Sequence, residues 1–239
     1  ALIYACFQDS RFMVVGTPSG ITLAAEGGAH QSIITPLIGI GQPGLTSFEP
    51  AYSDELAEVM RWGFDYMQLD KGGSVYLRLS TKPLSQLDRP MEAELINGIV
   101  SGAYWRRHPT AGSNGAIVYM GAVAPEAEAA HAKLSEENGA PGLLAVTSPE
   151  RLYSDWLFKG TDSYINKLLA ELGPEASLVT VLDGHPATLS WLGGVRGHRN
   201  KPLGVHGFGQ CGNLPILYAE HEIDAVSICR AYQNLNNHV

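Results

Sequence analysis

The stretch AIVYMGAVAPEAEAAHAKLSEENGAPGLLAVTSP, residues 116–149, decides the fold class. An apolar run at 116–120 precedes a segment at 125–137, in which alanines and a leucine recur on one helical face before Gly139, and a second apolar run follows at 143–146. Short buried runs joined by a helix of this length are typical of parallel strands, with the glycine ending the helix. Such units have right-handed crossovers. We therefore expect an α/β protein with a mainly parallel sheet.

Further elements with the same alternation follow this unit. Ser148 supplies an oxygen for an N-cap, and Pro149 suits a first helical turn because that position needs no amide donor. Apolar spacing and turn residues then predict a helix at 165–172, a strand at 178–182 and a last helix at about 224–235.

The first part of the chain has a less regular pattern. Its expected elements, in order, are a strand at 12–16, a glycine-rich loop at 26–44 with short strand pieces at 33–34 and 37–38, an amphipathic helix at about 50–67 and a strand at 74–80. Turn-forming residues gather at 81–113, with a short helix near 92–99. We place a linker at about 81–113, between a domain at 1–84 and a domain at 85–239.

Composition limits the classes of function. The 239 residues carry a net charge of −8, and 45% are hydrophobic against 17% charged, which is sufficient for a packed core. The acidic balance argues against non-specific nucleic-acid binding, and no apolar run reaches the roughly 20 residues of a membrane span. Three cysteines without a C-x-x-C spacing, and a start without a basic leader, predict reduced thiols and a cytoplasmic protein.

Two motifs could support chemistry. EGGAH at 26–30 places the carboxylate of Glu26 and the imidazole of His30 four residues apart, and a carboxylate can orient a histidine for proton transfer. The alternative is a loop histidine that caps local backbone. GFGQCG at 207–212 matches G-x-G-x-x-G, but it lacks the strand and the distant acid of a dinucleotide site, so a structural turn is favoured.

The other titratable candidates are less informative. For Asp183, His185, His206, His221 and Glu222 the default expectation is a surface or turn role, although ligands often lie at the carboxyl ends of parallel strands. The sequence contains neither H-E-x-x-H nor paired cysteines, so no metal site is expected.

Several segments, in this order, resemble one family. They are GTPSG at 16–20, EGGAH at 26–30, EPAY at 49–52, AVTS at 145–148, GVHGFG at 204–209 and EIDA at 222–225. This set resembles the single-chain decarboxylase component of bacterial pyruvate dehydrogenase, a thiamine-diphosphate enzyme related to transketolase. The sequence departs from the family at QSI, residues 31–33, where the family has an acidic, histidine-rich run, and at His206, where it usually has aspartate.

The resemblance implies a particular organisation. Residues 1–84 would be the C-terminal part of a pyrimidine-binding domain, and residues 85–239 a transketolase-type C-terminal domain, which is a three-layer α/β sandwich. The family motif G-D-G…N is absent. Thiamine diphosphate and magnesium would therefore bind mainly to regions outside this chain. A homodimer, a separate N-terminal polypeptide, or both would complete the enzyme, and the truncated first domain would expose a sheet edge and apolar surface.

The resemblance also assigns residues and a reaction. His30 would contact substrate and help proton transfer, with Glu26 as its acidic companion, and Gln31 would join His30 in substrate binding, since transketolases have glutamine there. The reaction would be oxidative decarboxylation of pyruvate or a similar 2-oxo acid, with acyl transfer to a lipoyl group of a partner acyltransferase. Transketolase-like ketol transfer, and a non-catalytic fragment for dimerisation or partner docking, are the alternatives.

Overall fold

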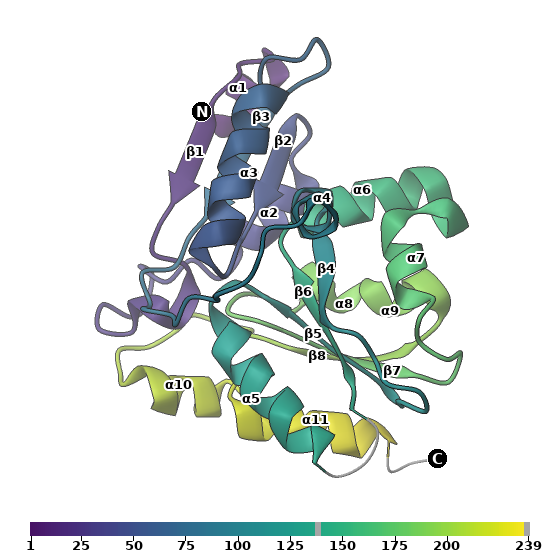
Figure 1. Cartoon of the computed structure of the whole chain (residues 1–239). Helices are drawn as coiled ribbons and strands as arrows, with labels where there is room; N and C mark the ends of the chain where they lie inside the picture. The colour runs from purple at the N-terminus through teal and green to yellow at the C-terminus, as the bar shows by residue number, and fades with distance from the viewer. Residues whose placement is uncertain (137–139, 237–239) are drawn as a thin grey trace.

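The computed structural model describes residues 1–136 and 140–236 and contains two sheets (Figure 1). The first is parallel, with order β1-β3-β2, and comprises β1 (Met13–Gly16), β3 (Ser74–Arg78) and β2 (Leu45–Phe48). The second, of order β4-β6-β5-β7-β8, comprises β4 (Ala103–Arg107), β6 (Gly142–Val146), β5 (Gly115–Met120), β7 (Ser177–Leu182) and β8 (Arg199–Leu203). Among the strands of the described residues, only β4 runs antiparallel to its neighbour. The expected α/β fold with mainly parallel sheets is confirmed.

The second sheet is the middle of three layers. Helices α5 (Ala124–Ser135) and α11 (Ala225–Asn236) pack together on one face, while α6 (Pro149–Lys159), α7 (Tyr164–Leu169), α8 (Ala187–Ser190) and α9 (Leu192–Arg196) lie on the other side (Figure 1). The sheet needs helices on both faces because the side chains of β5 alternate between two cores. Ile117 and Tyr119 join one core, and Val118 and Met120 join the other. The predicted sandwich is therefore confirmed.

The predicted helices of this half are present. Ser148 caps α6 by accepting a hydrogen bond from the Arg151 backbone N–H at 3.3 Å, and Pro149 stands in the first turn. The expected helix at 125–137 is α5, and its predicted stop, Gly139, lies outside the described residues. Helix α10 (Leu214–Glu220) precedes α11, and short 3-10 turns η2 (Gly121–Val123) and η3 (Gly160–Asp162) follow β5 and α6.

In the first half of the chain, the structure between β1 and β2 differs from the sequence prediction. Helix α1 (Leu2–Phe7), the 3-10 turn η1 (Gly20–Leu23) and helix α3 (Ser53–Tyr66) accompany the sheet, and α3 matches the predicted helix. The strand pieces predicted at 33–34 and 37–38 are wrong, because residues 33–34 are bends before helix α2 (Thr35–Gly41), which contains residues 37–38, and β2 follows it. Gly39 explains the close packing of α2 on β2, since a Cβ there would lie 2.2 Å from Ser47 Oγ.

The segment expected as a linker contains regular structure. Helix α4 (Ala93–Ser101) matches the short helix predicted near 92–99, but strand β4 was not expected and extends the second sheet by pairing with β6. Strand β4 has only three apolar residues before Arg106 and Arg107, so its apolar run is too short to predict a strand from the sequence. The division of the chain near residue 84, with a linker at about 81–113, stays a prediction.

The two sheets meet where their parallel strands end. The Glu49 backbone N–H, just after β2, donates to the Thr147 carbonyl after β6 at 2.8 Å. The Ser148 hydroxyl donates to the Ser47 carbonyl at 2.6 Å, and one hydrophobic core contains residues of both sheets. Carboxyl ends of parallel strands are the usual place for ligands in α/β proteins. Within the described residues, no helix is long and apolar enough to cross a membrane.

Candidate functional site

A buried charged cluster occupies the junction between the sheets. It consists of Glu49 after β2, Arg78 at the end of β3 and Asp183 after β7, whose residues are 4%, 2% and 0% exposed. Charges so deeply buried are costly unless they are paired and hydrogen-bonded. The partners of each group therefore show what this cluster holds in place.

Arg78 is the centre of the cluster. Its Nη1 donates to Glu49 Oε1 at 2.5 Å, and its Nη2 donates to the carbonyls of Ser32 at 2.7 Å and Asp183 at 2.8 Å. Its Nε donates to Thr35 Oγ1 at 2.9 Å. One guanidinium thus joins β2, the beginning of α2 and the end of β7.

The Asp183 carboxylate reaches from the second sheet to the first turn after β1. It accepts hydrogen bonds from the backbone N–H groups of Ile21 at 2.8 Å and Thr22 at 3.2 Å, and from the Tyr218 hydroxyl at 3.3 Å. Gly20 has a φ of +52°, and a Cβ there would lie 2.2 Å from Asp183 Oδ1. Glycine is therefore required for this approach.

The cluster holds two carboxylates for one guanidinium, which affects their protonation. Burial raises the pKa of Glu49 from 4.5 to about 7, although Arg78 opposes the shift. Burial also raises the pKa of Asp183, again opposed mainly by Arg78. Glu49 Oε2 has no hydrogen-bond partner. Burial therefore favours the protonated form of Glu49 more than it would be favoured in an exposed carboxyl.

The predicted catalytic residues lie on the loop that leaves this cluster. Glu26 and His30 are both exposed and follow η1. Among the described residues, no side-chain hydrogen bond joins Glu26 to His30 or links either one to a third group. The structure thus places both on one loop without pairing them, and their catalytic roles stay predictions.

Gln31 differs from these two residues because it is only 3% exposed. Its Nε2 donates to the carbonyls of Leu23 and Gln210, both at 3.3 Å, whereas its Oε1 has no partner. The amide nitrogen of Gln31 is therefore used to hold the loop, and the predicted contact of this residue with substrate stays a prediction.

The G-x-G-x-x-G segment is the surface on which this loop docks. The Gly28 N–H donates to the Gly209 carbonyl at 3.1 Å, the Gly212 N–H donates to the Ala24 carbonyl at 3.0 Å, and Cys211 Sγ donates to the Ala25 carbonyl at 2.6 Å. The segment lies between β8 and α10, outside both. It is a turn, as expected, and Gly209 must be small because a Cβ there would collide with Gln31 Oε1. The loop is therefore bound to the second half of the chain.

The other titratable residues considered in the sequence do not form a second cluster among the described residues. His185 and His206 are neighbours, with ring centroids 5.9 Å apart, whereas Glu222 pairs with Arg230 at 2.6 Å on the surface. His221 lines a shallow cavity of about 330 Å³ together with His206. No group of three or more His, Cys, Asp or Glu in the described part of the chain could hold a metal ion.

Sequence reasoning missed Glu49 and Arg78 as members of the buried cluster. One signal existed for each: Glu49 directly follows a buried strand, and Arg78 ends an otherwise apolar one. Their partners, however, are 29 and 105 residues away along the chain. A single sequence does not show such pairings.

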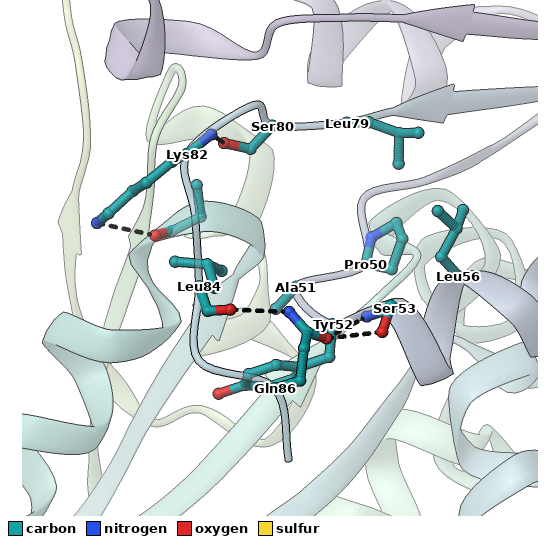
Figure 2. A pocket seen from close by; sticks show the side chains of 11 residues that line it. Pro50, Ala51, Tyr52, Ser53, Leu56, Leu79, Ser80, Lys82, Leu84 and Gln86 are labelled. Carbon is teal, nitrogen blue, oxygen red and sulfur yellow. Dashed lines mark hydrogen bonds between the residues drawn. The ribbon is translucent and has the colours of Figure 1, made fainter.

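A separate small pocket lies beside the start of α3. Figure 2 shows Tyr52, Ser53, Lys82 and Gln86 around a cavity of about 190 Å³. Gln86 Oε1 accepts from both the N–H and the hydroxyl of Ser53 at 2.8 Å, and Lys82 donates to a backbone carbonyl at 3.4 Å. Ser53, Gln86 and Lys82 are thus already paired, and the cavity volume is below the roughly 300 Å³ of usual ligand sites. The junction is therefore the stronger candidate.

Comparison with known proteins gives relatives of two kinds. No family model matches the chain. In sequence it is similar to the pyruvate dehydrogenase E1 component of Escherichia coli K12, with 28% identity over 114 residues, which are 48% of this chain and 13% of that protein. In structure it is similar to transketolase from Leishmania mexicana, with a TM-score of 0.76, 18% identity, and 99% of this chain matched to 32% of that one.

Two further structures have the same fold. Transketolase from Campylobacter jejuni has a TM-score of 0.75 and 16% identity, and 96% of this chain covers 32% of it. A split gene transketolase, described as an inactive beta4 tetramer, has a TM-score of 0.65 and 15% identity, and 98% of this chain covers 74% of it. The resemblance found in the motifs is confirmed: the chain is similar to a pyruvate dehydrogenase E1 component in sequence and to part of transketolase in fold.

Proposed function

We propose that the chain is the C-terminal portion of a thiamine-diphosphate-dependent decarboxylase of pyruvate or a similar 2-oxo acid, which passes the acyl unit to a lipoyl group of a partner acyltransferase. The observation that carries this proposal is the position of His30. It lies exposed, without a side-chain partner, on a loop anchored where the carboxyl ends of two parallel sheets meet. The sequence similarity to the E1 component favours this reaction class.

The residues of this chain do not by themselves fit magnesium and a diphosphate. The described residues include no group of three potential metal ligands, and the buried carboxylates are already bonded to Arg78 or to backbone N–H groups. We therefore assign the cofactor to polypeptide outside this chain and derive no step through it. What this chain would contribute is the imidazole of His30, a group suited to general acid or base catalysis.

The first half of the chain would be completed by another polypeptide. Strand β1 forms an edge of its sheet, and α1 has no buried residue. We propose that the N-terminal part of the enzyme covers this edge and that the assembly contains two copies of the active unit. The acidic net charge favours small-molecule and protein partners over nucleic acid, and we keep the cytoplasm as the expected location.

Ketol transfer is the second candidate function. The structural similarity to transketolases favours it, as does the presence of Gln31 directly after His30. The two reactions differ in their acceptor and in whether carbon dioxide leaves. Carbon dioxide release from pyruvate, compared with ketol transfer from a sugar phosphate, therefore separates them in the assembled enzyme.

The role of His30 can be tested in that assembly. Removing a general acid or base usually lowers turnover about 100-fold or more, so we expect His30→Ala to reduce turnover on the accepted substrate by at least this factor. His108→Ala is the matched control, because His108 is exposed and follows β4, far along the chain from this loop. Unchanged turnover in His30→Ala would contradict the catalytic role.

The non-catalytic alternative has its own test. If the 239-residue chain serves only dimerisation or docking, it should bind neither thiamine diphosphate nor magnesium when alone, and the assembled enzyme should tolerate loss of His30. Calorimetry on the isolated chain measures the first property. Tight binding by the chain alone would contradict both this alternative and our assignment of the cofactor to other polypeptide.

A further inference from the structure

The loop at 20–32 is held at both ends by the buried charged cluster. At its beginning, the backbone N–H groups of Ile21 and Thr22 donate to the Asp183 carboxylate. At its end, the Ser32 carbonyl accepts from Arg78 Nη2. Arg78 also donates to the Asp183 carbonyl, so a single pair of side chains connects the two ends of the loop.

The anchoring crosses from one sheet to the other. Asp183 follows β7 in the second sheet, whereas the loop belongs to the first half of the chain. Hydrogen bonds to a charged group are roughly twice as strong as neutral ones, and Asp183 is fully buried. The position of the loop is therefore set by the second half of the molecule.

Stability alone does not account for this arrangement. Apolar side chains of similar volume often hold a buried junction as well as, or better than, charged ones. Here Asp183 and Arg78 make hydrogen bonds to loop backbone atoms, and one carboxylate oxygen of Glu49 has no hydrogen-bond partner. The bonds specify the course of the loop between residues 20 and 32, and His30 leaves the junction only two residues before Ser32.

We propose that Asp183 and Arg78 are positioning residues for the loop that carries His30. They contact the loop backbone and fix where the imidazole leaves the junction, without touching substrate. The consequence for catalysis rests on the proposed function of His30, but the anchoring of the loop does not. The second half of the chain would thereby control the geometry of a group carried by the first.

The anchoring is tested on the 239-residue chain by amide hydrogen exchange and by the NMR ring signals of its histidines. Asp183→Asn keeps the shape and removes the charge. We expect exchange at residues 20–32 to become about 10-fold faster or more, and the His30 ring signal to move toward the value of an unfolded chain. The His108 ring signal and exchange in β5 should not change.

Two further variants accompany Asp183→Asn: a control at a distant carboxylate and a weaker change at the same site. Asp224→Asn removes a carboxylate that accepts from the Ser227 N–H at the beginning of α11, and it should leave the loop unchanged. Tyr218→Phe removes one hydrogen bond to Asp183 and keeps the ring, so it should accelerate loop exchange about threefold. It provides the test even if Asp183→Asn does not fold.

Two results would overturn the proposal. One is unchanged exchange at 20–32 in both Asp183→Asn and Tyr218→Phe, and the other is an equal increase over the whole chain, which indicates a merely structural role. In the assembled enzyme we expect Asp183→Asn to lower kcat with little change in KM. If the loop becomes mobile and kcat is unchanged, loop anchoring stands, and the proposed role of His30 fails instead.

Discussion

The two halves of the molecule bury their sheets to different degrees. In β5 of the second half every residue is buried, because helices cover both faces. In β1 of the first half Val14 and Val15 are 36% and 48% exposed, and Ile3 and Phe7 of α1 are 73% and 85% exposed. Parallel sheets are normally covered on both faces. The comparison shows that the edge strand β1 of the first sheet exposes apolar side chains, whereas the central strand β5 of the second sheet exposes none.

The largest expected effect concerns this open edge. Val15→Lys places a charge on β1, and burying an unpaired charge in an interface is strongly unfavourable. We expect the association of the chain with the N-terminal polypeptide to weaken about 100-fold or more, as measured by sedimentation. The control is Val226→Lys on α11, where the replaced side chain is 63% exposed. Equal association by both variants would show that β1 is not the covered edge.

The next effect compares the two strands directly. Ile117 in β5 is fully buried, so Ile117→Ala should lower the free energy of unfolding by about 2–5 kcal/mol. Val14→Ala in β1 should change it by about 0.5 kcal/mol or less in the isolated chain. Urea unfolding measures both values. A similar loss for the two variants would mean that β1 is already covered, for instance by a second copy.

The smallest effect depends on pH. Glu49 holds its proton more tightly in the folded chain, with a pKa of about 7, than in the unfolded chain, where the ordinary value is 4.5. The folded state therefore binds more protons between these values, and the free energy of unfolding should fall as pH rises from about 4.5 to 7. Glu49→Gln should remove this part of the slope, at most about 3 kcal/mol for a shift of this size.

The comparison of wild type with Glu49→Gln isolates one group among several buried acids. Burial also raises the pKa of Glu55 and Asp183, so these groups add to the pH dependence of the wild type. Unfolding in urea at several pH values gives the difference between the two proteins. Parallel pH profiles for wild type and Glu49→Gln would be inconsistent with a proton held at Glu49.

The sequence predicted the second half of the fold better than the first. Strands β5, β6 and β7 are mostly apolar and are bounded by turns. The N-cap of α6, Ser148 followed by Pro149, is recognisable in the local sequence. In the first half, β2 has the sequence LTSF and α2 the sequence TPLIGIG, and neither pattern indicates its structure. These two elements depend on packing against each other, which overrides local preference.

By itself, the sequence determined the α/β class, most strands and long helices, and the ordered motifs that indicated the relatives. These depend on local spacing and caps, which are readable along the chain. Only the tertiary structure decided that Glu49, Arg78 and Asp183 form one buried cluster and that the loop of His30 docks on residues 207–212. Those contacts join residues far apart in the chain, and they form only when the carboxyl ends of two sheets are brought together.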